Sequence, residues 1–188
     1  MKRTIAYAML TALIVFSAIP ASATAAKPWY APRLEALGFQ VLDPPVEPRD
    51  FKVLSLDGAS RSLASSKGRV VLLNFWATWC PPCKAEIPSI ESLSRTMKDI
   101  SFEVFAVDLG ETPVTVKNFV AENKLSYPVY LDPKNSLARA YASQGIPTTY
   151  ILDKSGRFIA AMVGSFNYTK PEFLSLIREI ATKDAAAK

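Results

Sequence analysis

The sequence contains no histidine and only two cysteines among its 188 residues. Without an imidazole, the chain cannot use a Ser-His-Asp or Cys-His catalytic arrangement, and it cannot hold zinc or haem through histidine. Two cysteines are too few for a disulfide-rich scaffold or for a metal site of three or four thiolates. The chemistry that stays open is that of Cys80 and Cys83, which are separated by two residues.

Dense runs of positive charge are also missing. The chain has 22 lysines and arginines against 17 acidic residues, a formal net charge of +5 and a pI near 9.2. Because the basic residues are scattered, we expect no nucleic-acid site. The length is that of one domain, and a hydrophobic content of 49% is enough for a sizeable core.

The one long apolar run lies at the N-terminus. Lys2 and Arg3 precede a mostly apolar segment, residues 5–19, which has about the length of a signal-peptide core and is short for a membrane span. Small residues with A-x-A motifs follow at 21–25. We therefore predict that residues 1–26 are a cleaved signal peptide and that the protein acts in the periplasm or another extracytoplasmic part of the envelope. An uncleaved membrane anchor is the alternative.

We expect the rest of the chain to form a single domain with short flanks. Residues 27–48 are rich in proline and contain one short helical stretch near 33–37, so they are predicted to be an N-terminal extension that lies over the domain. The domain itself is predicted at 49–183, and a C-terminal tail at 184–188.

Strands and helices alternate along the predicted domain. Hairpins are expected at 51–63 and 148–163, further strands at 70–76, 102–107 and 127–131, and helices at 82–97, 113–123, 135–142 and 170–181. This order predicts an α/β sandwich with parallel and antiparallel strands and helices on both faces. Trp76 is expected in the core, whereas Asp108, Glu111 and Asp132 are expected to be solvated loop residues near strand ends.

The cysteines lie between a buried strand and a helix, in the segment Trp79-Cys80-Pro81-Pro82-Cys83. Cys80 falls at the start of the helix, where free backbone N–H groups and the helix dipole favour a thiolate. We expect Cys80 to be the outermost, attacking thiol and Cys83 to be the more buried, resolving thiol. Pro81 and Pro82 lack N–H groups that would stabilise the Cys80 thiolate, so we predict a comparatively reducing couple.

Half of a metal site and a purely structural disulfide are the other interpretations of a C-x-x-C motif. No further cysteine or histidine in the sequence completes a metal site. A two-residue loop gains little chain-entropy stabilisation from a disulfide. We therefore expect a redox-active disulfide, with no cofactor and no metal.

The segment VVLLNFWATWCPPCKAEIP, residues 70–88, resembles the active-site segment of the thioredoxin superfamily, and in particular of its exported TlpA/ResA-like branch. The resemblance extends over roughly residues 48–182. It implies a thioredoxin-like three-layer α/β/α sandwich with a mixed sheet, an N-terminal β-hairpin and a central αβ insertion. It also implies thiol–disulfide exchange as the activity.

Glu86 lies three residues after Cys83, on the same side of the predicted helix. The glutamate at this position of the TlpA/ResA-like branch is an active-site acid, so the resemblance implies that Glu86 carries a proton. The alternative is a solvated glutamate that interacts favourably with the helix dipole. Asn74 stands where thioredoxins proper have a buried aspartate, and an amide cannot ionise, which leaves Glu86 as the leading candidate.

The segment Gly145-Ile146-Pro147-Thr148 matches the cis-proline loop of the superfamily, which faces the cysteine pair. The implied cis bond between Ile146 and Pro147 leaves the backbone groups of Ile146 free to pair with a substrate chain. Trp79, Pro81 and Pro82 complete the expected substrate-binding surface. Pro88 matches the helix-kinking proline of the superfamily.

The resemblance implies an exported thiol-disulfide oxidoreductase that reduces disulfides in selected envelope proteins, for example during apocytochrome c maturation, with electrons from a membrane thiol reductase. A disulfide oxidant is one alternative. A peroxiredoxin-like peroxidase is another, although its nucleophile normally lies in a Thr-x-x-Cys setting and Ala77 stands at that threonine position here. A third is a Cu(I)-carrying thiol protein, whose relatives usually add a histidine.

Overall fold

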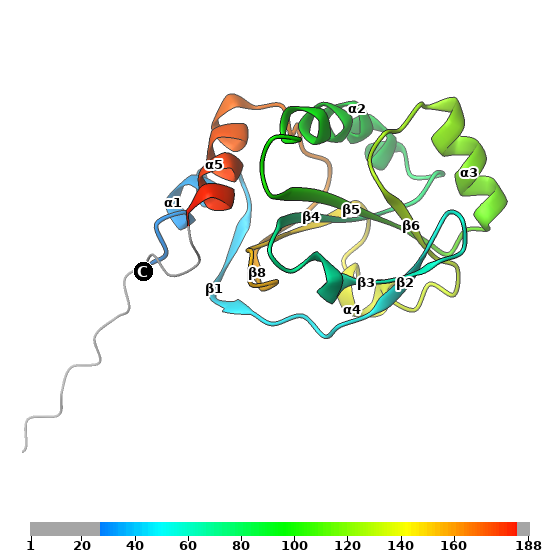
Figure 1. Ribbon diagram of the computed structural model, residues 1–188, viewed down its shortest axis with the longest axis horizontal. Helices are drawn as coiled ribbons and strands as arrows, with labels where there is room; N and C mark the ends of the chain where they lie inside the picture. The colour runs from blue at the N-terminus through cyan, green and yellow to red at the C-terminus, as the bar shows by residue number, and fades with distance from the viewer. Residues whose placement is uncertain (1–26, 184–188) are drawn as a thin grey trace, which may run out of the picture.

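A mixed sheet of eight strands forms the centre of the fold, in the order β1-β8-β7-β4-β5-β6-β2-β3 (Figure 1). The computed structural model describes residues 27–183, so the predicted signal peptide and the predicted tail lie outside the described residues. The strands are β1 (Gln40–Val46), β2 (Lys52–Ser55), β3 (Ser60–Ser62), β4 (Val70–Trp76), β5 (Phe102–Leu109), β6 (Val129–Asp132), β7 (Thr148–Leu152) and β8 (Phe158–Val163). The helices are α1 (Ala31–Ala36), α2 (Pro81–Thr96), α3 (Pro113–Glu122), α4 (Ala138–Tyr141), α5 (Pro171–Thr182) and a 3₁₀ turn, η1 (Leu63–Ser66).

Strand β4 occupies the middle of the sheet and leads directly to the cysteines. All seven of its residues are buried, as its continuous apolar sequence predicts. It pairs in parallel with β5 and antiparallel with β7, and β5 pairs in parallel with β6. The predicted thioredoxin-like α/β architecture with a mixed sheet is confirmed, with element ends that differ by at most three residues from those predicted.

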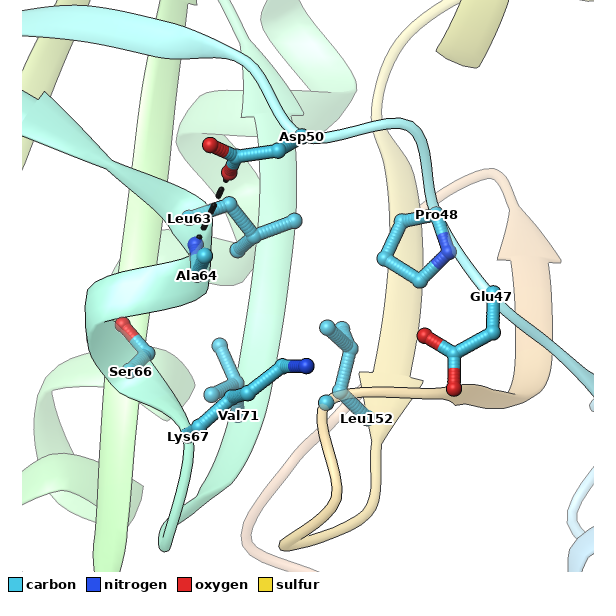
Figure 2. A pocket seen from close by; sticks show the side chains of 10 residues that line it. Glu47, Pro48, Asp50, Leu63, Ala64, Ser66, Lys67, Val71 and Leu152 are labelled. Carbon is cyan, nitrogen blue, oxygen red and sulfur yellow. Dashed lines mark hydrogen bonds between the residues drawn. The ribbon is translucent and has the colours of Figure 1, made fainter.

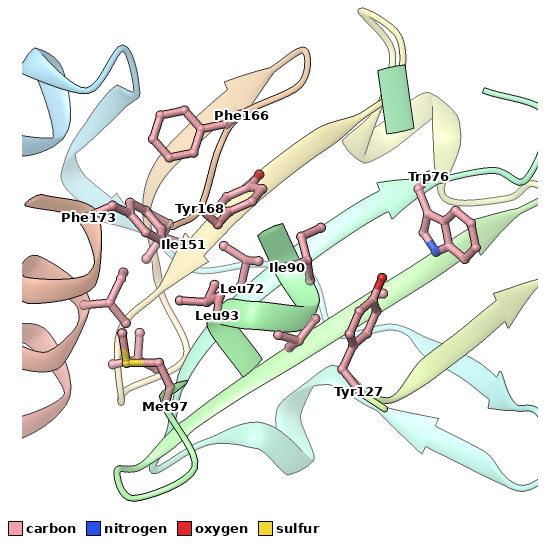
Figure 3. Close-up of a cluster of buried hydrophobic side chains, with 14 of the residues drawn as sticks. Leu72, Trp76, Ile90, Leu93, Met97, Tyr127, Ile151, Phe166, Tyr168 and Phe173 are labelled. Atoms are coloured by element: carbon pink, nitrogen blue, oxygen red, sulfur yellow. The ribbon is translucent and has the colours of Figure 1, made fainter. Parts of the chain in front are cut away.

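The two faces of the sheet carry separate cores. The larger core packs side chains of α1, α2, α3 and α5 against one face, and it contains both cysteines and Trp76. Figure 3 shows its aromatic part, where Phe166, Tyr168 and Phe173 pack together with centroid distances of 5.1–5.5 Å. The smaller core lies on the other face, beneath η1 and α4. None of the described helices is long and apolar enough to cross a membrane.

Part of the predicted extension belongs to the sheet, and the prediction that it only lies over the domain is wrong. Strand β1 pairs antiparallel with β8 at one edge of the sheet. Helix α1 packs beside α5 (Figure 1), with Leu34 fully buried and Arg33 donating to Glu179 at 2.6 Å. The prolines of β1 hide the strand in the sequence, but an edge strand tolerates proline because some of its N–H groups need no partner.

Two of the three acidic residues assigned to solvated loops are buried in strands, so that prediction is wrong for them. Asp108 is fully buried near the end of β5, and Asp132 is the last residue of β6. Strands β5 and β6 both extend beyond the ends that their apolar sequences predict. Their last residues, Leu109 and Asp132, are still paired with each other in the sheet. Glu111 does lie in a loop, but it is half-buried and hydrogen-bonded to Thr78.

Candidate active site

The cysteine pair lies where β4 passes into α2. Cys80 is the N-cap of α2 in an extended conformation, and its Sγ accepts a hydrogen bond from the backbone N–H of Cys83 at 3.3 Å. Pro81 and Pro82 occupy the first two helical positions, where proline costs no hydrogen bond. The two cysteines form a disulfide, with their Cα atoms 5.3 Å apart.

The expected difference in exposure between the two cysteines is very small in this oxidised form, in which both are buried. Cys80 is 2% exposed and Cys83 is 1% exposed. Cys80 is covered because the loop before β7 lies against it, with the carbonyl oxygen of Ile146 at 3.7 Å from Sγ. The neighbouring Trp79, in contrast, is 64% exposed.

The loop that covers Cys80 contains a cis peptide bond between Ile146 and Pro147, as predicted from the motif. The hydroxyl of Thr148 donates to the carbonyl oxygen of Gly145 at 2.6 Å, and the N–H of Gly164 donates to that of Pro147 at 2.8 Å. These bonds hold the loop from both sides. The half-buried Ile146 therefore presents its carbonyl group to the cysteine pair.

Glu86 points into the interior beneath α2 and is 2% exposed, so it is not the solvated glutamate of the alternative interpretation. Its Oε1 accepts a hydrogen bond from the Asn74 side chain at 2.8 Å, and its Oε2 accepts one from the Phe166 backbone at 3.3 Å. Asn74 donates a second bond to Thr149 at 2.9 Å. A network from β4 and β7 thus holds the Glu86 carboxyl group in place.

Burial raises the pKa of Glu86 to about 7, although the hydrogen bonds from Asn74 and Phe166 oppose the increase. The pKa is therefore close to neutral, where a carboxyl group can both accept and release a proton. Tyr168, which donates to Thr149 at 2.8 Å, is fully buried, and burial together with the Glu86 charge raises its pKa far above the usual range. Tyr168 is thus a neutral hydrogen-bond donor in this network.

The remaining residues predicted from the motifs lie on the surface near the disulfide, inside α2 or in the core. Pro81 and Pro82 are exposed beside Trp79 and form part of the surface around the cysteines. Pro88 lies inside α2, as predicted. Trp76 is buried in the core, which is confirmed.

A contact that the sequence motifs do not indicate anchors the loop before Cys80. Thr78 donates two hydrogen bonds to Glu111, and the buried Asp108 precedes Glu111 by three residues. A threonine two residues before Cys80 and an acid just after the neighbouring strand are the signals that could have indicated this contact. Neither signal alone predicts the contact, because the pairing of Thr78 with Glu111 depends on how the two loops fold.

A separate pocket lies at the opposite end of β4, where Val71 belongs to its wall (Figure 2). Glu47, Asp50 and Lys67 also line it, and Asp50 accepts a hydrogen bond from the N–H of Ala64 at 2.9 Å. Neither cysteine lines this pocket. It is therefore distinct from the redox site.

A thioredoxin fold with a cysteine pair at the start of α2 and a cis-proline loop against it defines a thiol-disulfide oxidoreductase, and the comparisons with known proteins agree. The chain belongs to the AhpC/TSA family, whose model matches residues 47–161.

Among the relatives of this chain, the thiol-disulfide oxidoreductase ResA of Bacillus cereus is 34% identical over 134 residues, which cover 71% of this chain and 76% of that protein. ResA of Geobacillus kaustophilus is 34% identical over 116 residues, covering 62% and 67%. A solved structure from Chlorobium tepidum, described as a thiol:disulfide interchange protein DsbE, is similar with a TM-score of 0.66 and 28% identity over 73% of this chain and 96% of that one. StoA of Bacillus subtilis gives a TM-score of 0.59 and 29% identity over 70% and 99%.

Proposed function

We propose that this oxidoreductase works as an extracytoplasmic reductant of selected protein disulfides, among them the haem-site cysteines of apocytochromes c. The observation that carries the proposal is the buried Glu86 held beneath the helix that begins at the Cys80–Cys83 pair. The similarity to proteins named ResA and DsbE supports the same class of activity. The N-terminal apolar run supports export.

The proposed reaction uses both cysteines in turn. The Cys80 thiolate attacks one sulfur of the substrate disulfide, forms a mixed disulfide and releases the other substrate sulfur as a thiolate. The Cys83 thiolate then attacks Cys80 Sγ, which releases the second substrate thiolate and forms the Cys80–Cys83 disulfide. Two electrons pass from the protein to the substrate. A membrane thiol reductase is the proposed source of the electrons that regenerate the dithiol.

Glu86 is the proposed proton carrier for Cys83, which must lose its proton before it can attack. A carboxyl group with a pKa near 7 accepts that proton at neutral pH and returns it when the dithiol forms again. The exposed Trp79 and prolines 81 and 82, together with the Ile146 backbone and Pro147, are proposed to bind the substrate chain around the reacting sulfurs.

Trapping of the mixed disulfide tests the proposal directly. In the Cys83→Ala variant the second step is impossible, so we expect defined partner proteins to stay bound to Cys80 in cells and to be released by reductant. Mass spectrometry identifies them. The Cys80→Ala/Cys83→Ala variant is the matched control and should capture none. Capture of no partner, or of only the most abundant envelope proteins in proportion to their amounts, would contradict a dedicated reductant.

The alternative functions, a peroxidase, a copper carrier and a disulfide oxidant, predict different experimental results. Peroxide consumption by the reduced protein would favour a peroxidase, and stoichiometric Cu(I) binding would favour a copper carrier. A disulfide oxidant requires a stabilised Cys80 thiolate, with a pKa well below about 6. The structure offers limited stabilisation, since among the described residues only the Cys83 N–H donates to Cys80 Sγ.

A further inference from the structure

A pair of acidic side chains, Asp108 and Glu111, lies next to the active-site loop and is distinct from Glu86. Glu111 accepts two hydrogen bonds from Thr78, one from its backbone N–H to Oε2 at 2.6 Å and one from its hydroxyl to Oε1 at 2.6 Å. Thr78 precedes Cys80 by two residues, in the loop between β4 and α2. Glu111 therefore ties the segment that carries Cys80 to the end of β5.

Gly110 brings Glu111 into this position. Its φ of +84° turns the chain directly after β5, and its N–H donates to the carbonyl oxygen of Asp132 at 3.0 Å. A residue with a side chain would be strained in this conformation. The turn directs Glu111 back towards Thr78 instead of along the sheet.

Asp108 lies beside Glu111 without a compensating partner. It is fully buried, and neither of its carboxyl oxygens has a hydrogen-bond donor within the described part of the chain. The backbone N–H of Glu111 is close enough to lower the pKa of Asp108 but does not reach hydrogen-bonding geometry. The charged groups that face Asp108 are Glu111 from the loop and Asp132 from β6, and both are acidic.

Basic side chains do not offset these charges. Across residues 27–183, no lysine or arginine forms an ion pair with Asp108 or Glu111. Burial raises the pKa of Asp108 to about 8, and the adjacent Glu111 carboxylate adds to the increase. Burial acts in the same direction on Glu111, but the neighbouring Asp108 carboxyl group and the hydrogen bonds from Thr78 outweigh it and lower the pKa of Glu111. At neutral pH the pair thus carries one proton, on Asp108, and one negative charge, on Glu111.

We propose that Asp108 and Glu111 share one proton and together position the Thr78–Cys80 segment, so that loss of this proton loosens the segment and slows the reactions of Cys80. With the proton present, Asp108 donates to Glu111, and Glu111 accepts from Thr78. Without it, two carboxylates face each other in the interior, and their repulsion moves Glu111 away from the Thr78 N–H. Asp108 and Glu111 are positioning residues, since they act on Cys80 through Thr78.

The pH dependence of Cys80 alkylation tests this inference. The reduced wild-type protein and the Asp108→Asn variant are mixed with iodoacetamide between pH 5.5 and 10, and modification of Cys80 is followed by mass spectrometry. An asparagine amide donates to Glu111 as the protonated aspartate does, but it cannot lose a proton. We expect the ratio of wild-type to variant rate to stay constant below pH 7 and to fall about tenfold between pH 7 and 9.5, as the charge-assisted bonds to Thr78 weaken.

Glu103→Gln is the matched control, because Glu103 is a buried carboxylate on the same strand that pairs with Arg61 and Arg69 and does not contact the loop. Its rate should stay in a constant ratio to the wild-type rate at every pH. A measurement without any variant is the Thr78 amide signal of oxidised wild-type protein in ¹H–¹⁵N NMR spectra, for which we expect an inflection near pH 8.

Parallel alkylation profiles for wild type and Asp108→Asn would overturn the inference. A Thr78 amide signal without an inflection between pH 6 and 10 would overturn it as well, and this measurement decides the matter if the variant does not fold. Neither readout involves a protein substrate or the direction of electron flow. The inference can therefore fail while the proposed reductant function stands, and the reverse is also possible.

Discussion

At the scale of single residues, Glu86 is the group whose surroundings most directly link structure to chemistry. It is buried, it is held by Asn74 and Phe166, and burial raises its pKa to about 7. Asn74 orients the carboxyl group without competing for the proton, because an amide does not titrate. We propose that Glu86, three residues after Cys83 on α2, takes the role that a buried aspartate has in thioredoxins proper.

Replacement of Glu86 by glutamine should slow disulfide exchange while the fold is kept. The amide cannot accept the Cys83 proton, so we expect the rate of substrate reduction at pH 7.5 to fall by about 10²-fold, the usual contribution of a general base. The wild-type rate should rise with a midpoint near pH 7, and the variant should lose that step. Stopped-flow reduction of a disulfide peptide measures both. Glu91→Gln, further along α2, is the control, and a variant that keeps the step would rule out Glu86 as the proton carrier.

The same substitution should also change how the free energy of unfolding depends on pH, and equilibrium unfolding measures the direction of that change. The pKa of Glu86 is raised in the folded protein, so its stabilising effect is present below the unfolded pKa near 4.5 and is lost as pH rises through about 7. From pH 4.5 to 8, the free energy of unfolding of the oxidised wild type should therefore decrease relative to Glu86→Gln, by about 3 kcal/mol at 1.36 kcal/mol per pKa unit. Urea titrations at the two pH values measure the difference.

The roles of residues that belong to short sequence motifs could be predicted from the sequence. Contacts that depend on packing between distant segments could not. The C-x-x-C pair and the glutamate three residues later are short motifs, and the cis Ile146–Pro147 bond is implied by the resemblance of residues 145–148 to the cis-proline loop of the thioredoxin superfamily. The contact between Thr78 and Glu111 joins residues 33 positions apart through two loops. The near-equal burial of Cys80 and Cys83 likewise depends on the distant loop that contains Ile146.

At the scale of elements, α1 and β1 support the site although they lie at the edge of the fold. Phe39, between these two elements, is 3% exposed and packs on Phe166 and Phe173 with centroid distances of 5.2 and 5.7 Å. The backbone N–H of Phe166 in turn donates to Glu86. The sequence predicted the buried central strands from their apolar runs, but the prolines of β1 concealed an element that completes both the sheet and this aromatic group.

Truncation of Phe39 should therefore affect both stability and the site. We expect Phe39→Ala to lower the free energy of unfolding by about 3–5 kcal/mol, the usual cost of removing a buried phenylalanine. The loss of packing on Phe166 should also shift the pH midpoint of exchange away from that of wild type, because the Phe166 N–H is one of two donors that hold Glu86. Phe51→Ala is the control, since Phe51 packs on the other face of the sheet. Equal shifts of the midpoint in both variants would contradict a specific link to Glu86.

At the scale of the whole molecule, the redox state of the cysteines is coupled to the stability of the fold. Cys80 and Cys83 are both members of the larger core, which packs four helices on one face of the sheet. The difference in the free energy of unfolding between the oxidised and reduced proteins therefore reflects how strongly the folded structure favours the disulfide. A couple that is more reducing than that of the unfolded chain requires the oxidised protein to be the more stable form.

This relation gives a test of the direction of electron flow that needs no substrate. Since Pro81 and Pro82 leave the Cys80 sulfur with one backbone donor among the described residues, we expect a weakly stabilised thiolate and thus a more stable oxidised form. Urea unfolding of the oxidised and reduced proteins at pH 7 measures the difference, and every 30 mV between the folded and unfolded couples corresponds to about 1.4 kcal/mol. The Cys80→Ala/Cys83→Ala variant should not respond to reductant. A reduced form more stable than the oxidised one would instead identify a disulfide oxidant, because a stabilised thiolate then drives the protein to pass its disulfide on.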